Sequence, residues 1–191
     1  MTKLTIRICV GLILTVGCCL VALAQDQNTA TSEKTVRYLK VKYDKQKNQT
    51  TVTLKRMSLS SAMNKEVNSV TEVAQLDLDG SFDYPGQKLS QAVEAVTLNF
   101  RALSKFPVYQ NPQNVVGVVD GDRALMLGAT SYKSNSQTFM IEEVLSISVP
   151  YTALKRMADS KSLRIFLGTR EIKFREKDQE ALRELASFMT P

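Results

Sequence analysis

The residues of this chain that could do chemistry are almost all carboxylates and amines. The sequence has no histidine and no tryptophan, and its three cysteines, Cys9, Cys18 and Cys19, lie within the first 24 residues. Thiolate and imidazole are the usual ligands of soft and borderline metals and the usual groups of nucleophilic catalysis. If the first segment is removed, the rest of the chain must act without them, so we expect no metal, no cofactor and no enzyme activity.

One group of carboxylates could bind Ca²⁺ or act as acid and base. Asp77, Asp79 and Asp83 lie around Gly80, but the spacing and the terminal Glu of a calcium loop are absent. Period-two alternation in this segment instead predicts a strand on which Asp77 and Asp79 form the solvent face. A hydrolase that uses Asp77, Asp79 or Asp120 is the second alternative function, and it requires these carboxylates to meet in a cleft.

Two further carboxylate pairs have simpler structural interpretations. Asp120 and Asp122 flank Gly121, and an Asp-Gly pair between apolar runs is typical of a tight hairpin turn. Glu142 and Glu143 are neighbours within an expected strand, where adjacent side chains point to opposite faces. We therefore expect one of these glutamates to be solvated and the other to have a partner within the fold.

A serine or threonine nucleophile is poorly supported. The sequence has no Gly-x-Ser-x-Gly motif and no Ser-x-x-Lys motif, and Thr152 with Lys155 is the nearest match to the second. The spacing places Lys155 on the exposed side of a short helix. We therefore predict that the chain has no catalytic residues.

The feature with the clearest functional meaning is a basic segment over 34–56. It holds eight basic residues and one acid, whereas the rest of the chain after residue 24 holds 15 basic and 18 acidic residues. Such a segment could bind phosphate groups of anionic lipid or an anionic glycan, and nucleic acid does not suit an exported protein. The alternative is a hairpin edge that lysines protect from aggregation. The candidate ligand-binding residues are Lys40, Lys42, Lys45, Lys47 and Lys55.

The first residues have the pattern of an export signal. Lys3 and Arg7 precede an uncharged run over 8–24 that ends in Ala-Leu-Ala. We favour cleavage after Ala24, which leaves no membrane span, over an uncleaved anchor or a lipid on Cys18. Accordingly, we expect a signal peptide at 1–24, a flexible leader at 25–33 and a single domain at 34–191. The protein is expected to be secreted or periplasmic.

Alternating apolar residues and turn signals predict a mainly β, α+β fold. We expect an antiparallel β-sandwich or open barrel of about seven to nine strands, with two helices in the C-terminal region. The polar stretch 60–69 is expected to be a loop. The expected strands are 35–43, 50–59, 73–82, 93–103, 115–119, 123–127, 139–149, 163–167 and 171–174, and the expected helices follow Pro150 and cover 176–189.

Five stretches carry a resemblance to a known group of proteins. They are VTLNFRALS, VVDGDRALMLG, EVLSISVPYTALKRMADS, LRIFLGTREIKF and ALRELA. Together they resemble a set of small secreted bacterial proteins of unknown function. That group has no established activity, so the resemblance implies a fold and no site residues. Arg175 stands just before the last helix where Ser or Thr would be usual, which predicts a looser helix start.

These observations favour a non-enzymatic secreted or envelope domain that acts by binding or as a structural part. The partner is unknown, and the basic segment indicates an anionic envelope component. Binding of an anionic lipid or glycan surface through 34–56 is the first alternative, and the carboxylate hydrolase is the second.

Overall fold

The computed structural model describes residues 32–59, 73–137 and 139–191, which form eleven strands and two helices. The signal predicted at 1–24, most of the leader and the loop predicted at 60–69 lie outside the described residues. Among the residues that are described, no helix is long and apolar enough to cross a membrane. The mainly β architecture with two helices near the C-terminus confirms the predicted fold class.

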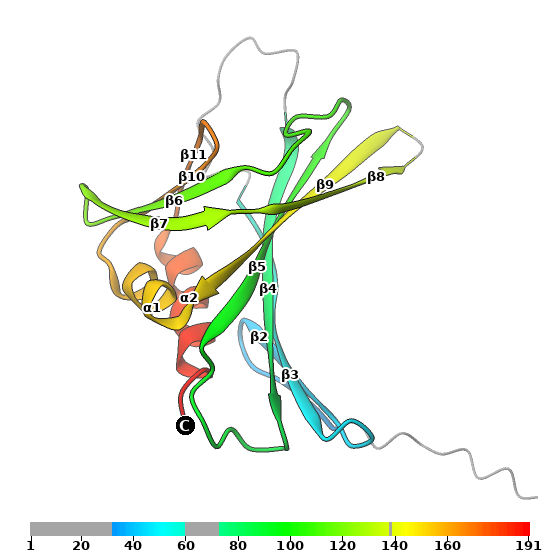
Figure 1. The fold of residues 1–191 in the computed structure, drawn as a ribbon, viewed down its shortest axis with the longest axis vertical. Helices are drawn as coiled ribbons and strands as arrows, with labels where there is room; N and C mark the ends of the chain where they lie inside the picture. Colours follow the sequence, from blue (N-terminus) through cyan, green and yellow to red (C-terminus); the bar gives the residue numbers. More distant parts are fainter. Residues whose placement is uncertain (1–31, 60–72, 138) are drawn as a thin grey trace, which may run out of the picture.

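The larger of two sheets has seven antiparallel strands in the order β1-β2-β3-β4-β5-β9-β8 (Figure 1). The first five are neighbours along the chain as well as in space, and β9 then pairs with β5. Antiparallel neighbours can be joined by a short turn, as β2 and β3 are here. The strands are β1 (Ser32–Thr35), β2 (Leu39–Asp44), β3 (Gln49–Ser58), β4 (Val73–Pro85), β5 (Ala95–Ser104), β8 (Ser131–Gln137) and β9 (Met140–Pro150).

The smaller sheet has four antiparallel strands in the order β11-β10-β6-β7. Its strands are β6 (Asn114–Val119), β7 (Arg123–Ala129), β10 (Leu163–Leu167) and β11 (Arg170–Lys173). Asp120 and Gly121 both have positive φ, +53° and +95°, in the β6–β7 turn. This left-handed backbone is what the Asp-Gly signal predicts, so the expected hairpin is confirmed.

One nearly continuous stretch of chain belongs to both sheets. β7 lies in the small sheet and β8 in the large one, and only Thr130 separates them. Thr130 is buried, its N–H donates to the Gln113 carbonyl, and its hydroxyl accepts from the Gln113 N–H, both at 2.8 Å. This pair of bonds fixes the point where the chain passes from one sheet to the other.

Two strands were not expected from the sequence. β8 has the sequence SYKSNSQ, which lacks apolar alternation, and its hydrogen bonds to β9 hold it at the sheet edge. β1 takes Ser32 and Glu33 from the stretch expected to be a leader, and these residues pair with Tyr43 and Lys42. The count of eleven strands therefore exceeds the seven to nine expected.

Both helices lie on the same side of the large sheet as the small sheet (Figure 1). α1 (Tyr151–Asp159) packs against β6 and β9, and α2 (Glu176–Ser187) packs against β2, β3 and α1. The start of α2 is not loose, contrary to expectation. The Arg175 N–H donates to Asp178 Oδ2 at 3.0 Å, and the Asp178 N–H donates back to the Arg175 carbonyl at 2.9 Å. The Asp178 carboxylate thus binds the backbone N–H of Arg175 and fixes that residue at the start of the helix, as the acidic residue of a capping box does.

The core lies between the large sheet and these covering elements. Leu78, Phe100 and Leu145 pair across β4, β5 and β9, and all three are fully buried. Burial of each such side chain contributes about 1.5–3 kcal/mol before entropy is counted. Gly80 lies in the next row, where an added Cβ would come within 2.8 Å of Leu98. Close strand contact therefore requires glycine at this position.

Candidate functional site

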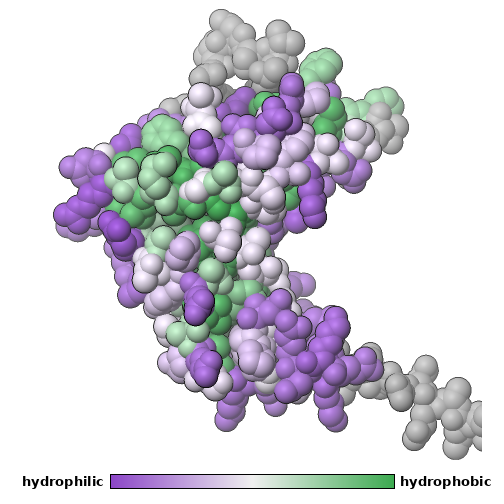
Figure 2. All heavy atoms as spheres, viewed as in Figure 1, coloured by the Kyte–Doolittle hydropathy of each residue, from purple (hydrophilic) through white to green (hydrophobic). Residues whose placement is uncertain are grey.

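The predicted lysines lie on a hairpin that projects from one end of the large sheet. Lys40 pairs with Thr53 and Lys42 with Thr51, so both lysines lie on the polar side of β2, opposite buried Leu39 and Val52. Lys45 and Lys47 are exposed in the β2–β3 turn. Figure 2 shows hydrophilic side chains gathered over this end of the molecule, at the lower right.

The turn that carries Lys45 and Lys47 has a defined shape. Asp44 Oδ1 accepts from the N–H groups of Gln46 at 2.9 Å and Lys47 at 3.2 Å. Asn48 adopts a left-handed φ of +47°, and its side-chain oxygen accepts the Tyr43 hydroxyl at 3.1 Å. An Asx turn of this kind holds the backbone while leaving both amines in solvent.

The five candidate lysines are not equivalent. Lys55 Nζ donates to the carbonyls of Val36 at 2.7 Å and Arg37 at 2.9 Å, so its amine is occupied within the fold. Lys40 lies 3.6 Å from Glu33 across the β1–β2 ladder. Within the described ranges, no ion pair neutralises the other three, Lys42, Lys45 and Lys47. We call these three residues the lysine tip.

The base of the hairpin is attached to α2. The Tyr38 N–H donates to Glu184 at 3.0 Å, and the Tyr38 hydroxyl donates to Glu180 at 2.9 Å. Arg37 lies 3.2 Å from Glu180 and covers the Tyr38 ring at 4.8 Å. Desolvation and the bond to Glu180 raise the pKa of Tyr38, which therefore stays a donor at neutral pH. The base is thus fixed by polar contacts, while the lysine tip extends beyond them.

The chain enters the described fold beside the lysine tip. β1 begins at Ser32, which pairs with Tyr43, the residue just before the turn-forming Asp44. Because β1 and β2 are antiparallel, its opposite end, Thr35, pairs with Lys40, farther from the turn. The N-terminal segment that holds the predicted signal therefore joins the domain at the same end as the lysine tip.

The expectation that Asp77 and Asp79 face solvent is wrong. Asp77 is 4% exposed, and the side chain of Asp79 is 15% exposed. Both lie on the outer face of the large sheet, but their cross-strand neighbours cover them. Arg101 binds Asp79 and also lies 3.5 Å from Glu142, while Asn99 donates to Asp79 at 2.7 Å. The bond to Asp79 raises the pKa of Arg101.

A small pocket of about 160 Å³ lies beside this cluster, and Asp77, Glu142, Arg56 and Arg101 are among its lining residues. Gln75 donates to Asp77 Oδ2 at 2.7 Å, whereas Oδ1 is buried and has no hydrogen-bond partner. Of the three aspartates named in the hydrolase hypothesis, Asp77 alone is among the lining residues of this pocket. Arg101 bridges Asp79 and Glu142, an arrangement typical of a structural ion-pair network.

The other candidate aspartates lie apart from that cluster. Asp83 is exposed and accepts the Thr51 hydroxyl at 2.5 Å. Asp120 lies in the β6–β7 turn, on the small sheet, and Asp122 follows it as an exposed residue. Lys155 is exposed and forms a 2.8 Å ion pair with Asp159, so the predicted exposure of Lys155 is confirmed.

The two neighbouring glutamates point to opposite faces, as expected, and both have partners. Glu142 reaches Arg101, whereas Glu143 is fully buried. Glu143 accepts hydrogen bonds from the Tyr132 hydroxyl and from three consecutive N–H groups, with all four distances between 2.7 and 3.0 Å. The three amides belong to Val108, Tyr109 and Gln110.

Glu143 thus holds the β5–β6 connection against β9 of the large sheet. Gln110 in that connection has a left-handed φ of +55°, which costs an ordinary residue roughly 1–2 kcal/mol. The hydrogen bonds from its own N–H and its neighbours offset this cost. The sequence shows two adjacent glutamates but gives no sign of partners that lie about thirty-four positions earlier.

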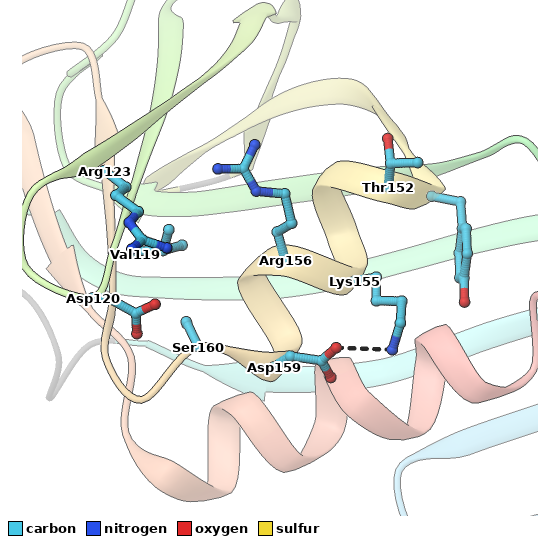
Figure 3. Close-up of a pocket in the computed structure, with 9 residues that line it drawn as sticks. Val119, Asp120, Arg123, Thr152, Lys155, Arg156, Asp159 and Ser160 are labelled. Atoms are coloured by element: carbon cyan, nitrogen blue, oxygen red, sulfur yellow. Dashed lines mark hydrogen bonds and ion pairs between the residues drawn. The ribbon is translucent and has the colours of Figure 1, made fainter.

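A larger pocket of about 410 Å³ lies between α1 and the β6–β7 turn (Figure 3). Its wall combines Val119 and Tyr151 with charged side chains from both elements, among them Arg123 and Arg156. The sequence does not predict this site, because residues that are distant in the chain form it. The spacing of Thr152, Arg156 and Asp159 on one side of a helix is the only local signal.

Among the residues that the structure describes, no three His, Cys, Asp or Glu side chains are grouped to hold a metal ion. Comparison with known proteins gives no further guide, since no family model, no curated protein and no solved structure matches the chain. The resemblance to small secreted bacterial proteins stays a prediction.

Proposed function

We propose that this protein is an exported, non-catalytic domain that binds an anionic membrane surface through the lysine tip. The observation that carries the proposal is the coincidence of two features at one end of the fold. Lys42, Lys45 and Lys47 extend there without carboxylate partners, and Ser32 pairs with Tyr43 beside them. The predicted export segment therefore connects to the domain where the unpaired positive charge lies.

Electrostatics gives the expected strength. A lysine close to an anionic bilayer contributes about 1 kcal/mol, so three contribute roughly 3 kcal/mol. This is weak binding for a lone domain, and stable attachment generally takes two signals. A retained apolar segment or a lipid on Cys18 would supply the second one. If Ala24 is the cleavage point, the lysine tip acts alone and the attachment is brief and reversible.

A membrane surface suits the tip better than a glycan does. Glycan sites usually combine polar groups with an aromatic platform, whereas the nearest aromatic residue, Tyr43, is half-buried and uses its hydroxyl on Asn48. The tip instead offers exposed amines on long side chains around a fixed turn, which can meet phosphates at many positions. The phosphate headgroups of an anionic bilayer provide negative charges at many positions.

The test uses protein purified after export and sedimented with vesicles of phosphatidylcholine, with or without phosphatidylglycerol. Wild-type protein should bind only the anionic vesicles, and added salt should weaken the binding. Lys42→Glu, Lys45→Glu and Lys47→Glu together should reduce binding at least about tenfold. The matched control reverses three exposed lysines elsewhere, at Lys133, Lys161 and Lys177.

Three results would contradict the proposal. Equal losses in the tip variant and the control would mean that only net charge matters. Binding that salt does not weaken would exclude an electrostatic contact. Lysine-dependent binding of a soluble sulfated polysaccharide, with no binding to vesicles, would replace the membrane with a glycan.

A further inference from the structure

We propose that the pocket between α1 and the β6–β7 turn binds a small organic anion, with its acidic group between Arg123 and Arg156. Both arginines line the pocket, one from each wall. In Figure 3 their side chains extend into the space between the turn and the helix. This site is separate from the lysine tip. The β2–β3 hairpin, which carries the tip, lies on the other side of the fold from the β6–β7 turn (Figure 1).

The two guanidinium groups lack a protein anion. In the described part of the chain, no hydrogen bond or ion pair involves the side chain of Arg123 or Arg156. Two like charges that share a pocket repel each other, and an anion between them removes that repulsion. Each guanidinium also offers a planar set of donors that matches the oxygens of a carboxylate or a phosphate.

The acidic residues of the pocket are already engaged. Asp159 forms a 2.8 Å ion pair with Lys155 along the helix. Asp120 Oδ1 accepts the Lys161 N–H at 2.8 Å. The Lys161 N–H is neutral, so Asp120 keeps its negative charge. Arg123, Lys155 and Arg156 against Asp120 and Asp159 leave the lining with a net charge of +1, so the pocket attracts negative charge.

The frame of the pocket is held in place before any ligand binds. The Asp120 N–H donates to the Ser162 carbonyl at 3.0 Å, and Arg164 donates to the Gly121 carbonyl at 2.9 Å. On the helix side, the Ser160 hydroxyl donates to the Met157 carbonyl, and Gln179 donates to Ser160. These bonds tie the turn and the end of α1 to the core, so a ligand would meet a preformed wall.

The wall also defines what the ligand must carry besides its charge. Val119 and Tyr151 provide apolar surface, and a pocket of about 410 Å³ exceeds what a bare inorganic anion fills. An oxyanion attached to a compact apolar body fits both parts. A phosphate monoester and a carboxylic acid share this chemistry, and the test separates them.

The experiment titrates the exported protein with phenyl phosphate, benzoate, inorganic phosphate and benzyl alcohol, and follows binding by calorimetry. Phenyl phosphate or benzoate should bind at least about tenfold more tightly than inorganic phosphate, because only they also reach the apolar wall. Benzyl alcohol should not bind measurably. The tighter of the two organic anions identifies the ligand class as phosphate or carboxylate.

Variants then test the role of the two arginines. Arg123→Ala and Arg156→Ala should each weaken binding by about 10- to 100-fold, the usual range for lost bonds to a charged group. Arg156→Lys should recover only part of the affinity that Arg156→Ala loses, since lysine lacks the paired donors of arginine. Lys177→Ala, on an exposed part of α2, should bind as wild type does. Thermal unfolding of each variant checks that it is folded.

The proposal fails if the alanine variants bind phenyl phosphate and benzoate as wild type does. It also fails if inorganic phosphate binds as tightly as the organic anions, or if none of them binds. Loss of vesicle binding by the lysine-tip variant does not bear on these outcomes, so the two proposals can fail separately.

Discussion

At the lysine tip, three positive side chains reach solvent and form no ion pair among the described residues, whereas Glu143, on the same sheet, is closed off from solvent and accepts four hydrogen bonds. The tip charges contribute little to the fold and remain available to an outside partner. The Glu143 carboxylate makes its contacts inside the fold, where it holds the β5–β6 connection in one conformation. The role of a charged residue in this fold therefore depends on its partners and not on its type alone.

The largest effect should come from removing the buried carboxylate. Glu143→Ala leaves three amides and one phenol without an acceptor, which should lower the free energy of unfolding by about 3 kcal/mol or more. Urea denaturation at neutral pH measures this. Glu142→Ala, the next residue on the opposite face, is the control and should cost about 1 kcal/mol or less. Equal losses in the two variants would mean that the buried Glu143 contributes no more to stability than Glu142 does.

A pH dependence should follow from Tyr109, which lies in the connection that Glu143 holds. Burial raises the pKa of Tyr109 to about 12, above its ordinary value of 10. The folded state therefore keeps a proton that the unfolded state loses as the pH rises above 10. Stability should fall between about pH 10 and 12, by roughly 2–3 kcal/mol in total.

Tyr109→Phe tests this dependence directly. Among the described residues the buried Tyr109 hydroxyl has no hydrogen-bond partner, so its removal should cost little at neutral pH. Urea denaturation at pH 9 and above should show a flatter decline in the variant. A smaller decline should remain, because desolvation also raises the pKa of Tyr38 and Tyr132. A variant that loses stability as steeply as wild type would exclude Tyr109 as the source.

The smallest effect on folding should come from the lysine tip. Replacement of Lys42, Lys45 and Lys47 by Gln should change the free energy of unfolding by less than about 0.5 kcal/mol, since the amines contact nothing that the fold needs. The same variant should bind anionic vesicles more weakly. Chemical denaturation and vesicle sedimentation on one preparation give both values. A large loss of stability would mean that these lysines act inside the fold after all.

Much of the fold could be predicted because its signals are local. Leu39 and Val52 alternate with polar neighbours, and this period of two identified the strands that carry them. The Asp120-Gly121 pair identified a turn because positive φ is needed there. β8 was missed because it has no such pattern and depends on its partner β9 for its conformation.

The candidate sites were harder to predict because they depend on contacts between distant residues. The sequence identified all the lysines of the hairpin but could not reveal that Lys55 is bonded to the backbone at Val36 and Arg37. It could not place Arg101 between Asp79 and Glu142, and so it left Asp79 in solvent. Nor could the sequence predict that Arg123 and Arg156 line one pocket, since this depends on a strand pairing and on the packing of a helix.

The direct connection from β7 to β8 through Thr130 affects how the protein unfolds. Because only Thr130 separates β7 from β8, opening of β7 should disturb the large sheet through β8, and we expect the two sheets to open together. Amide hydrogen exchange at Val116 and Leu145, one in each sheet, should then proceed through a single common opening event.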